Sequence, residues 1–293
     1  MKTIKENKKA LVVEGGGMRG IFTTGVLDSF LSSAFDPFDM YFGVSVGAST
    51  LSSFLAGQFK RHFRIFTEMA CRPEFMSLKR MITGGSYMDL DWLWNTVEAS
   101  SPLDTPSIDL NLKGKECYIV CTHVETGKPL YLSPWGKEWI GILKASSAIP
   151  LLYKHFPQFE GAPLADGGVS DPIPVMEAYN KGARHIVVIR TRPVNARKEA
   201  WLTPAISSMF FNNTPQLKEE IRSQARRYNE TLDFMESPPS DLTITQIAPQ
   251  TAMKTRRTSK QNQFLINDYS EGVKRGLHAI DILDPKDQQA LTH

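Results

Sequence analysis

Gly43-Val44-Ser45-Val46-Gly47 stands between a short apolar run and a run of small residues. Residues 40–44 read as a buried strand, and residues 48–57 read as a helix. A G-x-S-x-G sequence between a strand and a helix is the context of a nucleophile elbow, in which glycines permit a sharp turn and leave the serine hydroxyl exposed. The alternative interpretation is a structural serine that caps the helix.

The same strand-to-helix rhythm continues along the chain of 293 residues. Further buried strands are expected at residues 9–13, 116–122, 184–191 and 242–247. Further helices are expected at residues 21–35, 140–148, 214–236 and 263–283. Strands that alternate with helices are typical of a mostly parallel sheet that helices cover on both faces. No break in composition divides the chain, so we expect an α/β fold in a single domain over residues 1–293.

Composition and charge exclude several classes of protein. The chain is 41% hydrophobic and 22% charged, as in ordinary globular proteins, and its formal net charge of +3 gives no reason to expect a nucleic-acid partner. Three cysteines cannot build a disulfide framework and suit a reducing compartment. The apolar run after the polar first ten residues is too short for a signal peptide, and no run approaches the ~20 residues of a spanning helix. We therefore expect a cytoplasmic protein.

A second motif, Gly15-Gly16-Gly17-Met18-Arg19-Gly20, follows the first predicted strand. It matches the dinucleotide fingerprint G-x-G-x-x-G, but that fingerprint also needs an acidic residue at the end of the next strand, where Ser45 stands. Three consecutive glycines at a helix N-terminus equally leave backbone N–H groups free to bind an oxyanion. Arg19 either anchors this loop or faces an acidic group of a substrate. Dinucleotide binding through Gly15–Gly20 stays as an alternative.

The base that would activate an elbow serine is the open question. A histidine usually takes this role, but none of the six histidines follows a late strand in a short loop. Leu164-Ala165-Asp166-Gly167-Gly168 offers a carboxylate instead, and its two glycines allow another backbone to come close. Burial raises the pKa of such an aspartate and makes it a stronger base. The alternative is an ordinary Asp-Gly turn.

Taken together and in this order, the three motifs resemble those of the patatin-like phospholipases. The pattern of that family is G-G-G-x-[RK]-G, G-x-S-x-G and D-G-[GA], and residues 15–20, 43–47 and 166–168 match it without a departure. The resemblance covers residues 9–192, includes Ala-Ser-Ser-Ala-Ile-Pro at residues 145–150, and is strongest to bacterial stand-alone members. It implies a three-layer α/β/α fold and a lipid acyl hydrolase of the phospholipase, lysophospholipase or carboxylesterase type. Residues 193–293 carry helices and a strand but no recognised motif.

The resemblance also implies a role for each motif residue. Ser45 is the expected nucleophile and Asp166 the expected general base of a Ser-Asp dyad that forms an acyl-enzyme. The expected oxyanion hole consists of the N–H groups of Gly15, Gly16, Gly17 and Met18. The remaining motif residues are expected to support these groups: Arg19, Gly20, Gly43, Gly47, Gly167 and Gly168. No cofactor and no metal ion are expected. A non-catalytic lipid-binding protein on the same fold is a further alternative.

Other side chains suggest where a lipid could be held. Residues 58–97 are rich in Phe, Met and Trp, which suits an acyl-chain pocket or lid as well as ordinary core. A second apolar group suggests an interfacial element or an amphipathic helix: Trp201, Ile206, Met209, Phe210 and Phe211. Basic residues gather in two places and either attract anionic headgroups or face solvent: Arg222, Arg226 and Arg227, and Lys254, Arg256, Arg257 and Lys260. We expect a lipid or acyl-ester substrate and peripheral contact with the inner membrane surface.

Overall fold

A sheet of eight strands forms the centre of the computed structural model, which describes residues 7–199 and 214–284. The strands are β1 (Lys8–Val13), β2 (Met40–Val44), β3 (Glu116–His123), β4 (Pro129–Leu132), β5 (Gln158–Phe159), β6 (Ala162–Asp166), β7 (Ala183–Ile189) and β8 (Thr243–Ile247). Their order is β5-β6-β3-β2-β1-β7-β8, with β4 paired to β3. The pairs from β3 to β8 along this order are parallel, and β4, β5 and β6 are joined by antiparallel pairs.

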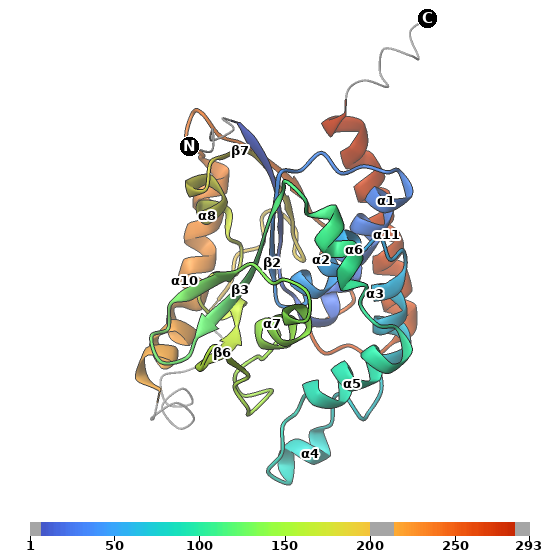
Figure 1. Cartoon of the computed structure of the whole chain (residues 1–293), viewed down its shortest axis with the longest axis vertical. Helices are drawn as coiled ribbons and strands as arrows, with labels where there is room; N and C mark the ends of the chain where they lie inside the picture. The colour runs from blue at the N-terminus through green and yellow to red at the C-terminus, as the bar shows by residue number, and fades with distance from the viewer. Residues whose placement is uncertain (1–6, 200–213, 285–293) are drawn as a thin grey trace, which may run out of the picture.

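Helices cover both faces of the sheet (Figure 1). One face carries α1 (Gly20–Ser32), α2 (Val46–Leu55), α7 (Glu138–Ser146) and α11 (Asn262–Leu283), and the other carries α8 (Val175–Asn180) and α10 (Pro215–Glu236). Side chains alternate along a strand, so Leu11 and Val13 of β1 join the core of the first face while Val12 joins that of the second. The three-layer α/β/α fold predicted from the sequence is confirmed.

Short helices make up most of the segment between β2 and β3. They are α3 (Arg61–Arg64), a π-helical turn (Ile65–Met69), α4 (Leu78–Ile82), α5 (Leu90–Ser100) and α6 (Thr105–Asn111). Figure 1 shows α4 and α5 at the lower end of the molecule, below the sheet. The sequence predicted the parallel strands and the long helices, but it did not predict these helices or the antiparallel strands β4, β5 and β6. All of these elements except α5 are only two to seven residues long, which is too short to show a clear period.

The C-terminal third is packed onto this core. β8 extends the sheet beside β7, and α11 (red in Figure 1) lies along α1. Glycines allow the two helices to touch: a Cβ on Gly272 of α11 would come within 2.1 Å of the carbonyl oxygen of Phe22 in α1.

The pairing register of β3 places the C-terminal ends of β2 and β6 at the same level of the sheet. β2 ends with Val44 opposite Val120, and β6, which runs the other way, ends with Asp166 opposite Cys121. The C-terminal ends of β2 and β6 therefore lie on either side of β3, opposite consecutive residues of that strand. Ser45 follows β2 directly, so the sheet itself brings Ser45 and Asp166 into contact.

Candidate active site

Ser45 stands in a strained turn between β2 and α2. Its φ of 55° and ψ of −131° lie in a region that residues with a side chain rarely adopt, at a cost of about 1–3 kcal/mol. Its N–H donates to Oγ of Ser146 in α7 over 2.8 Å, and that hydroxyl donates onward to the carbonyl of Val120. The turn is tightly enclosed, because a Cβ on Gly47 would lie 2.6 Å from the carbonyl oxygen of Glu14 and one on Gly43 would lie 2.6 Å from backbone of α2.

The hydroxyl of Ser45 is bonded directly to Asp166. Oγ donates to Oδ2 of Asp166 over 2.6 Å, and the other carboxylate oxygen, Oδ1, accepts the N–H of Gly168 over 2.7 Å. Both residues are only 6% exposed. The backbone of Asp166 is held by Thr122, whose hydroxyl donates to its carbonyl over 2.8 Å, and a Cβ on Gly167 would collide with backbone of β3. No histidine in residues 7–199 or 214–284 is bonded to Ser45.

Burial raises the pKa of the Asp166 carboxyl above its ordinary value, because the charged form loses its hydration. The hydrogen bonds from Ser45 and Gly168 and the positive charges of Arg257 and Lys198 oppose this shift. Asp166 is therefore a carboxylate with few water contacts and a raised basicity, which is what a direct proton acceptor needs.

A second buried carboxylate, that of Asp171, accepts a hydrogen bond from a tyrosine instead of a serine. Burial raises the pKa of Asp171 to about 6, yet its Oδ2 accepts the hydroxyl of Tyr131 over 2.7 Å. A raised pKa by itself would point to either aspartate as the base. The bond to a serine hydroxyl distinguishes Asp166 from Asp171.

The glycine loop lies against the elbow. A Cβ on Gly15 would come within 2.9 Å of Cβ of Ser45, so the loop and the elbow are in backbone contact. Thr191 fixes the loop from the end of β7, since its N–H donates to Oε2 of Glu14 and its hydroxyl donates to the carbonyl of Gly15. Within the part of the chain that the structure describes, the N–H groups of Gly15, Gly16 and Gly17 donate to no protein acceptor.

Two motif residues, Met18 and Arg19, make contacts within the protein. The N–H of Met18 donates to the carbonyl of Arg257 over 3.0 Å, so this N–H is already engaged, and the place of Met18 in the oxyanion hole stays a prediction. The Arg19 side chain is half-buried, and its loss of hydration lowers its pKa to about 10, with Glu14 as the opposing charge. It lines neither pocket at Ser45, and this position favours loop anchoring over substrate contact. Gly20 packs against Val46.

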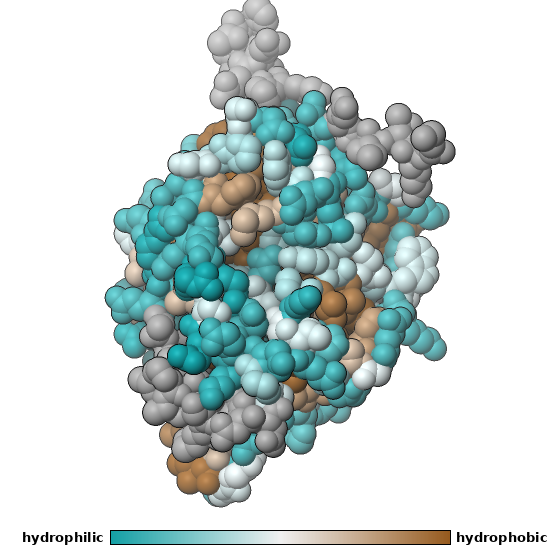
Figure 2. Space-filling view, turned by 90° about the vertical axis from the view of Figure 1, so that its left-hand side faces the viewer, coloured by the Kyte–Doolittle hydropathy of each residue, from teal (hydrophilic) through white to brown (hydrophobic). Residues whose placement is uncertain are grey.

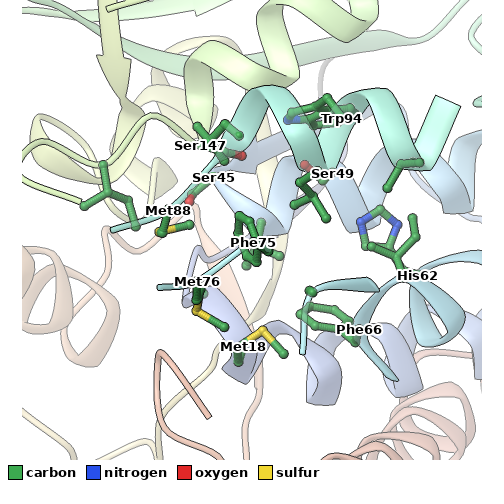
Figure 3. A pocket seen from close by; sticks show the side chains of 18 of the residues that line it. Met18, Ser45, Ser49, His62, Phe66, Phe75, Met76, Met88, Trp94 and Ser147 are labelled. Carbon is green, nitrogen blue, oxygen red and sulfur yellow. The ribbon is translucent and has the colours of Figure 1, made fainter. Parts of the chain in front are cut away.

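An apolar pocket opens at Ser45, with a cavity volume of about 90 Å³, room for far more than one water molecule. In Figure 3, Ser45 lies at one side of this pocket and His62 at the opposite side. Most of its lining comes from the Phe- and Met-rich segment: Ile65, Phe66, Ala70, Phe75, Met76, Met88, Leu90, Leu93, Trp94 and Val97. Most of these side chains also belong to the buried hydrophobic core, so both interpretations of residues 58–97 stay open for them, whereas Phe59 and Met81 are exposed.

A second, polar pocket lies on the other side of the dyad. It contains Asp166, which the apolar pocket does not, and it is lined by the glycine loop and by two cations, Lys198 and Arg257, of which Arg257 also lines the apolar pocket. Neither cation was predicted as a site residue. Arg257 belongs to the basic cluster for which the sequence left attraction of anionic headgroups and a solvent-exposed face open, and Lys198 had no signal in the sequence.

The arginines on α10 are paired with acidic residues. Arg222, Arg226 and Arg227 form ion pairs with glutamates of their own helix. The apolar group at Trp201, Ile206, Met209, Phe210 and Phe211 lies outside the described residues. Over the described ranges, we find no group of three His, Cys, Asp or Glu side chains that could hold a metal ion. No helix among them is long and apolar enough to span a membrane.

Two known proteins and two family models match this chain. YjjU of Escherichia coli strain K12, an uncharacterized protein, is 34% identical over 281 residues, which span 93% of this chain and 77% of YjjU. The crystal structure of VipD from Legionella pneumophila is 14% identical with a TM-score of 0.43, and the match covers 94% of this chain and 67% of VipD. A family model for a domain of unknown function, DUF6363, matches residues 214–284.

The family model for patatin-like phospholipase matches residues 11–179. That range is more than half of the chain and contains the glycine loop, the elbow serine and Asp166 with its two glycines. Membership supports lipid acyl hydrolase activity in general. The chain belongs to the patatin-like phospholipase family.

Proposed function

We propose that this protein hydrolyses acyl esters of lipids with Ser45 as nucleophile and Asp166 as general base. One observation carries the proposal: the 2.6 Å hydrogen bond from Oγ of Ser45 to Oδ2 of Asp166 inside a site that water scarcely reaches. A nucleophile and its base within hydrogen-bond reach are the signature of covalent catalysis.

The reaction follows from this geometry. As Oγ of Ser45 attacks the ester carbonyl, its proton passes to Oδ2 of Asp166, and the carbonyl oxygen becomes an oxyanion. The free N–H groups of Gly15, Gly16 and Gly17 are the donors for that oxyanion, and each such donor is worth about 10²–10³ in rate. Collapse of the intermediate breaks the ester bond, and Asp166 returns the proton to the leaving alcohol. Water, deprotonated by Asp166, then attacks the acyl-enzyme, and Asp166 returns the proton to Oγ of Ser45 as the fatty acid leaves.

The acyl chain belongs in the apolar pocket. Its walls are aliphatic, aromatic and methionine side chains, which pack against methylene groups without directional bonds. The pocket begins at Ser45, so a chain lying in it has its carbonyl carbon beside the nucleophile (Figure 3).

We also infer that the protein docks on a membrane surface through residues 76–88, here named the tip hairpin. Its base is the pairing of Met76 with Met88, both of which line the apolar pocket. Its tip is α4, where Leu78 is 63% exposed and Ile82 is 77% exposed. Figure 2 shows apolar residues at the lowest end of the molecule, where Figure 1 places α4. Insertion of this tip would bring the pocket to the lipid.

We further propose a cytoplasmic location and a single domain. The described cysteines, Cys71, Cys117 and Cys121, are free thiols, which supports a location at the cytoplasmic side of the membrane. The pairing of β8 with β7 and the packing of α11 on α1 support a chain that folds as one domain.

Turnover of p-nitrophenyl esters by purified variants tests the function. We expect Ser45→Ala and Asp166→Asn to lose about 10⁴-fold or more in kcat with unchanged circular dichroism. Asp171→Asn is the matched control, because it removes the neighbouring buried carboxylate, and it should keep its turnover. Full activity in Asp166→Asn would overturn the dyad. Lipid binding without any turnover would favour the non-catalytic alternative, and tight NAD binding the dinucleotide alternative.

A further inference from the structure

Two basic side chains line the polar pocket without a salt bridge. Lys198 and Arg257 both line it, and neither side chain forms an ion pair with a carboxylate among the residues described. Nζ of Lys198 lies 3.9 Å from the ring centroid of Tyr228, and Arg257 is held at its backbone, where its carbonyl accepts the N–H of Met18. The carboxylates of Asp166 and Glu14 act on these cations only through space, so no salt bridge competes with an anion for either charged group.

Positive charges outnumber negative ones around Lys198. Burial lowers the pKa of its ammonium group to about 7. The negative charge of Glu14 opposes this shift, and three nearby positive charges add to it: Arg257, Arg192 and Arg19. An anion in the pocket would stabilise the charged form of Lys198 and make charge-assisted hydrogen bonds.

The position of Asp166 tells which part of a substrate enters the polar pocket. Asp166 must return a proton to the leaving alcohol, and Asp166 lines the polar pocket but not the apolar one. With the acyl chain in the apolar pocket and the carbonyl at Ser45, the alcohol portion therefore lies beside Lys198 and Arg257.

We propose that Lys198 and Arg257 form an anion subsite that binds a phosphate on the alcohol portion of the substrate, so that the enzyme cleaves phosphate-bearing lipid esters in preference to neutral ones. This inference rests on the proposed hydrolase function and adds the substrate class and two specificity residues to it. Arg257 lies within the stretch matched by the domain of unknown function, residues 214–284. That stretch thereby contributes a side chain to the active site.

Arg257 can be tested without disturbing the glycine loop. Its Cγ and its carbonyl oxygen lie 2.7 Å and 2.6 Å from the position of a Cβ on Gly17, so the backbone and the inner side chain pack on the loop. Arg257→Gln keeps those atoms and removes the charge, and Arg257→Lys keeps a charge. The preceding residue, Arg256, is exposed, which makes Arg256→Gln a matched control.

The experiment compares kcat and KM for lysophosphatidic acid and for monoacylglycerol with the same acyl chain. We expect the wild type to prefer the phosphate-bearing ester. Arg257→Gln and Lys198→Gln should each lose this preference by roughly 10- to 100-fold, mainly through KM, because a charge-assisted hydrogen bond to the phosphate is lost. Arg257→Lys should restore most of it, and Arg256→Gln should not change it.

Two outcomes separate failure of the subsite from failure of the function. An unchanged ratio of the two kcat/KM values in both Gln variants, with turnover intact, would overturn the subsite and leave the hydrolase standing. Failure of the wild type to hydrolyse either ester would refute the proposed function and the subsite with it. If Arg257→Gln does not fold, Lys198→Gln decides the question, supported by competition of inorganic phosphate with monoacylglycerol hydrolysis in the wild type.

Discussion

Oγ of Ser45 lies 2.6 Å from Oδ2 of Asp166, although 121 positions separate the two residues in the chain. Strand β3 makes this contact possible, because it pairs with Val44 at one residue and with Asp166 at the next. The contact thus depends on the register of three strands rather than on a flexible loop. A nucleophile and a base that are both fixed to one sheet need little reorganisation before reaction.

Replacement of Ser45 by glycine tests the strain in the elbow. Ser45→Gly and Ser45→Ala both remove the hydroxyl, but only glycine adopts a φ of 55° without a steric cost. We expect the free energy of unfolding of Ser45→Gly to exceed that of Ser45→Ala by about 1 kcal/mol, since relief of strain outweighs the entropy of glycine in the unfolded chain. Urea denaturation of the two variants measures this difference. Equal stabilities would mean that the turn is unstrained.

The pH dependence of kcat/KM should report the ionisation of Asp166. Burial raises the pKa of this carboxyl above its ordinary 3.8, and only the ionised form accepts a proton, so activity should fall as the pH drops through the raised pKa. The positive charge of Arg257 lowers that pKa. Arg257→Gln should therefore move the acid limb to higher pH, and Arg257→Lys should leave it in place. An acid limb that does not move in Arg257→Gln would contradict the electrostatic coupling.

Polar substitutions at the tip hairpin should weaken membrane binding without affecting the chemistry. Leu78 and Ile82 are exposed on α4, and burial of such side chains in a membrane is worth ~1.5–3 kcal/mol each. The double variant Leu78→Ser/Ile82→Ser should bind phosphatidylglycerol vesicles at least ~10-fold more weakly in sedimentation assays. Its turnover of a soluble p-nitrophenyl ester should be unchanged. Leu110→Ser on α6, where Leu110 is 59% exposed, is the control, and equal loss in both would exclude a specific role for α4.

Two glycine-to-alanine substitutions test whether the C-terminal third folds with the rest. A Cβ on Gly272 would collide with backbone of α1, whereas one on Gly141 in α7 would meet nothing within 4 Å. Gly272→Ala should therefore cost about 2 kcal/mol, and Gly141→Ala should gain about 0.5–1 kcal/mol from helix propensity.

The fluorescence of tryptophan supplies the readout for that comparison. All five tryptophans precede residue 214, so their unfolding transition reports on the N-terminal part of the chain. In a single cooperative unit, Gly272→Ala lowers the midpoint of this transition although the substitution lies in α11. A tryptophan transition that stays in place while the circular dichroism signal splits into two steps would show two separate domains.

Local patterns and long-range contacts differ in how far the sequence predicts them. The elbow at Ser45 could be predicted because its turn chemistry is contained in five consecutive residues. The sequence could not distinguish Arg256 from Arg257, because Arg256 is exposed to solvent whereas Arg257 lines both pockets at Ser45. The backbone bond from Met18 to Arg257 was equally hidden, since it depends on how residues beyond β8 return to the glycine loop.

The Ser45–Asp166 dyad can be tested by labelling the intact protein with a fluorophosphonate, followed by peptide mass spectrometry. The probe reacts only with a serine that a neighbouring base activates. We expect a single adduct on Ser45 in the wild type, none in Ser45→Ala, and labelling slowed by orders of magnitude in Asp166→Asn but not in Asp171→Asn. An adduct on another serine, or undiminished labelling of Ser45 in Asp166→Asn, would contradict the Ser45–Asp166 dyad.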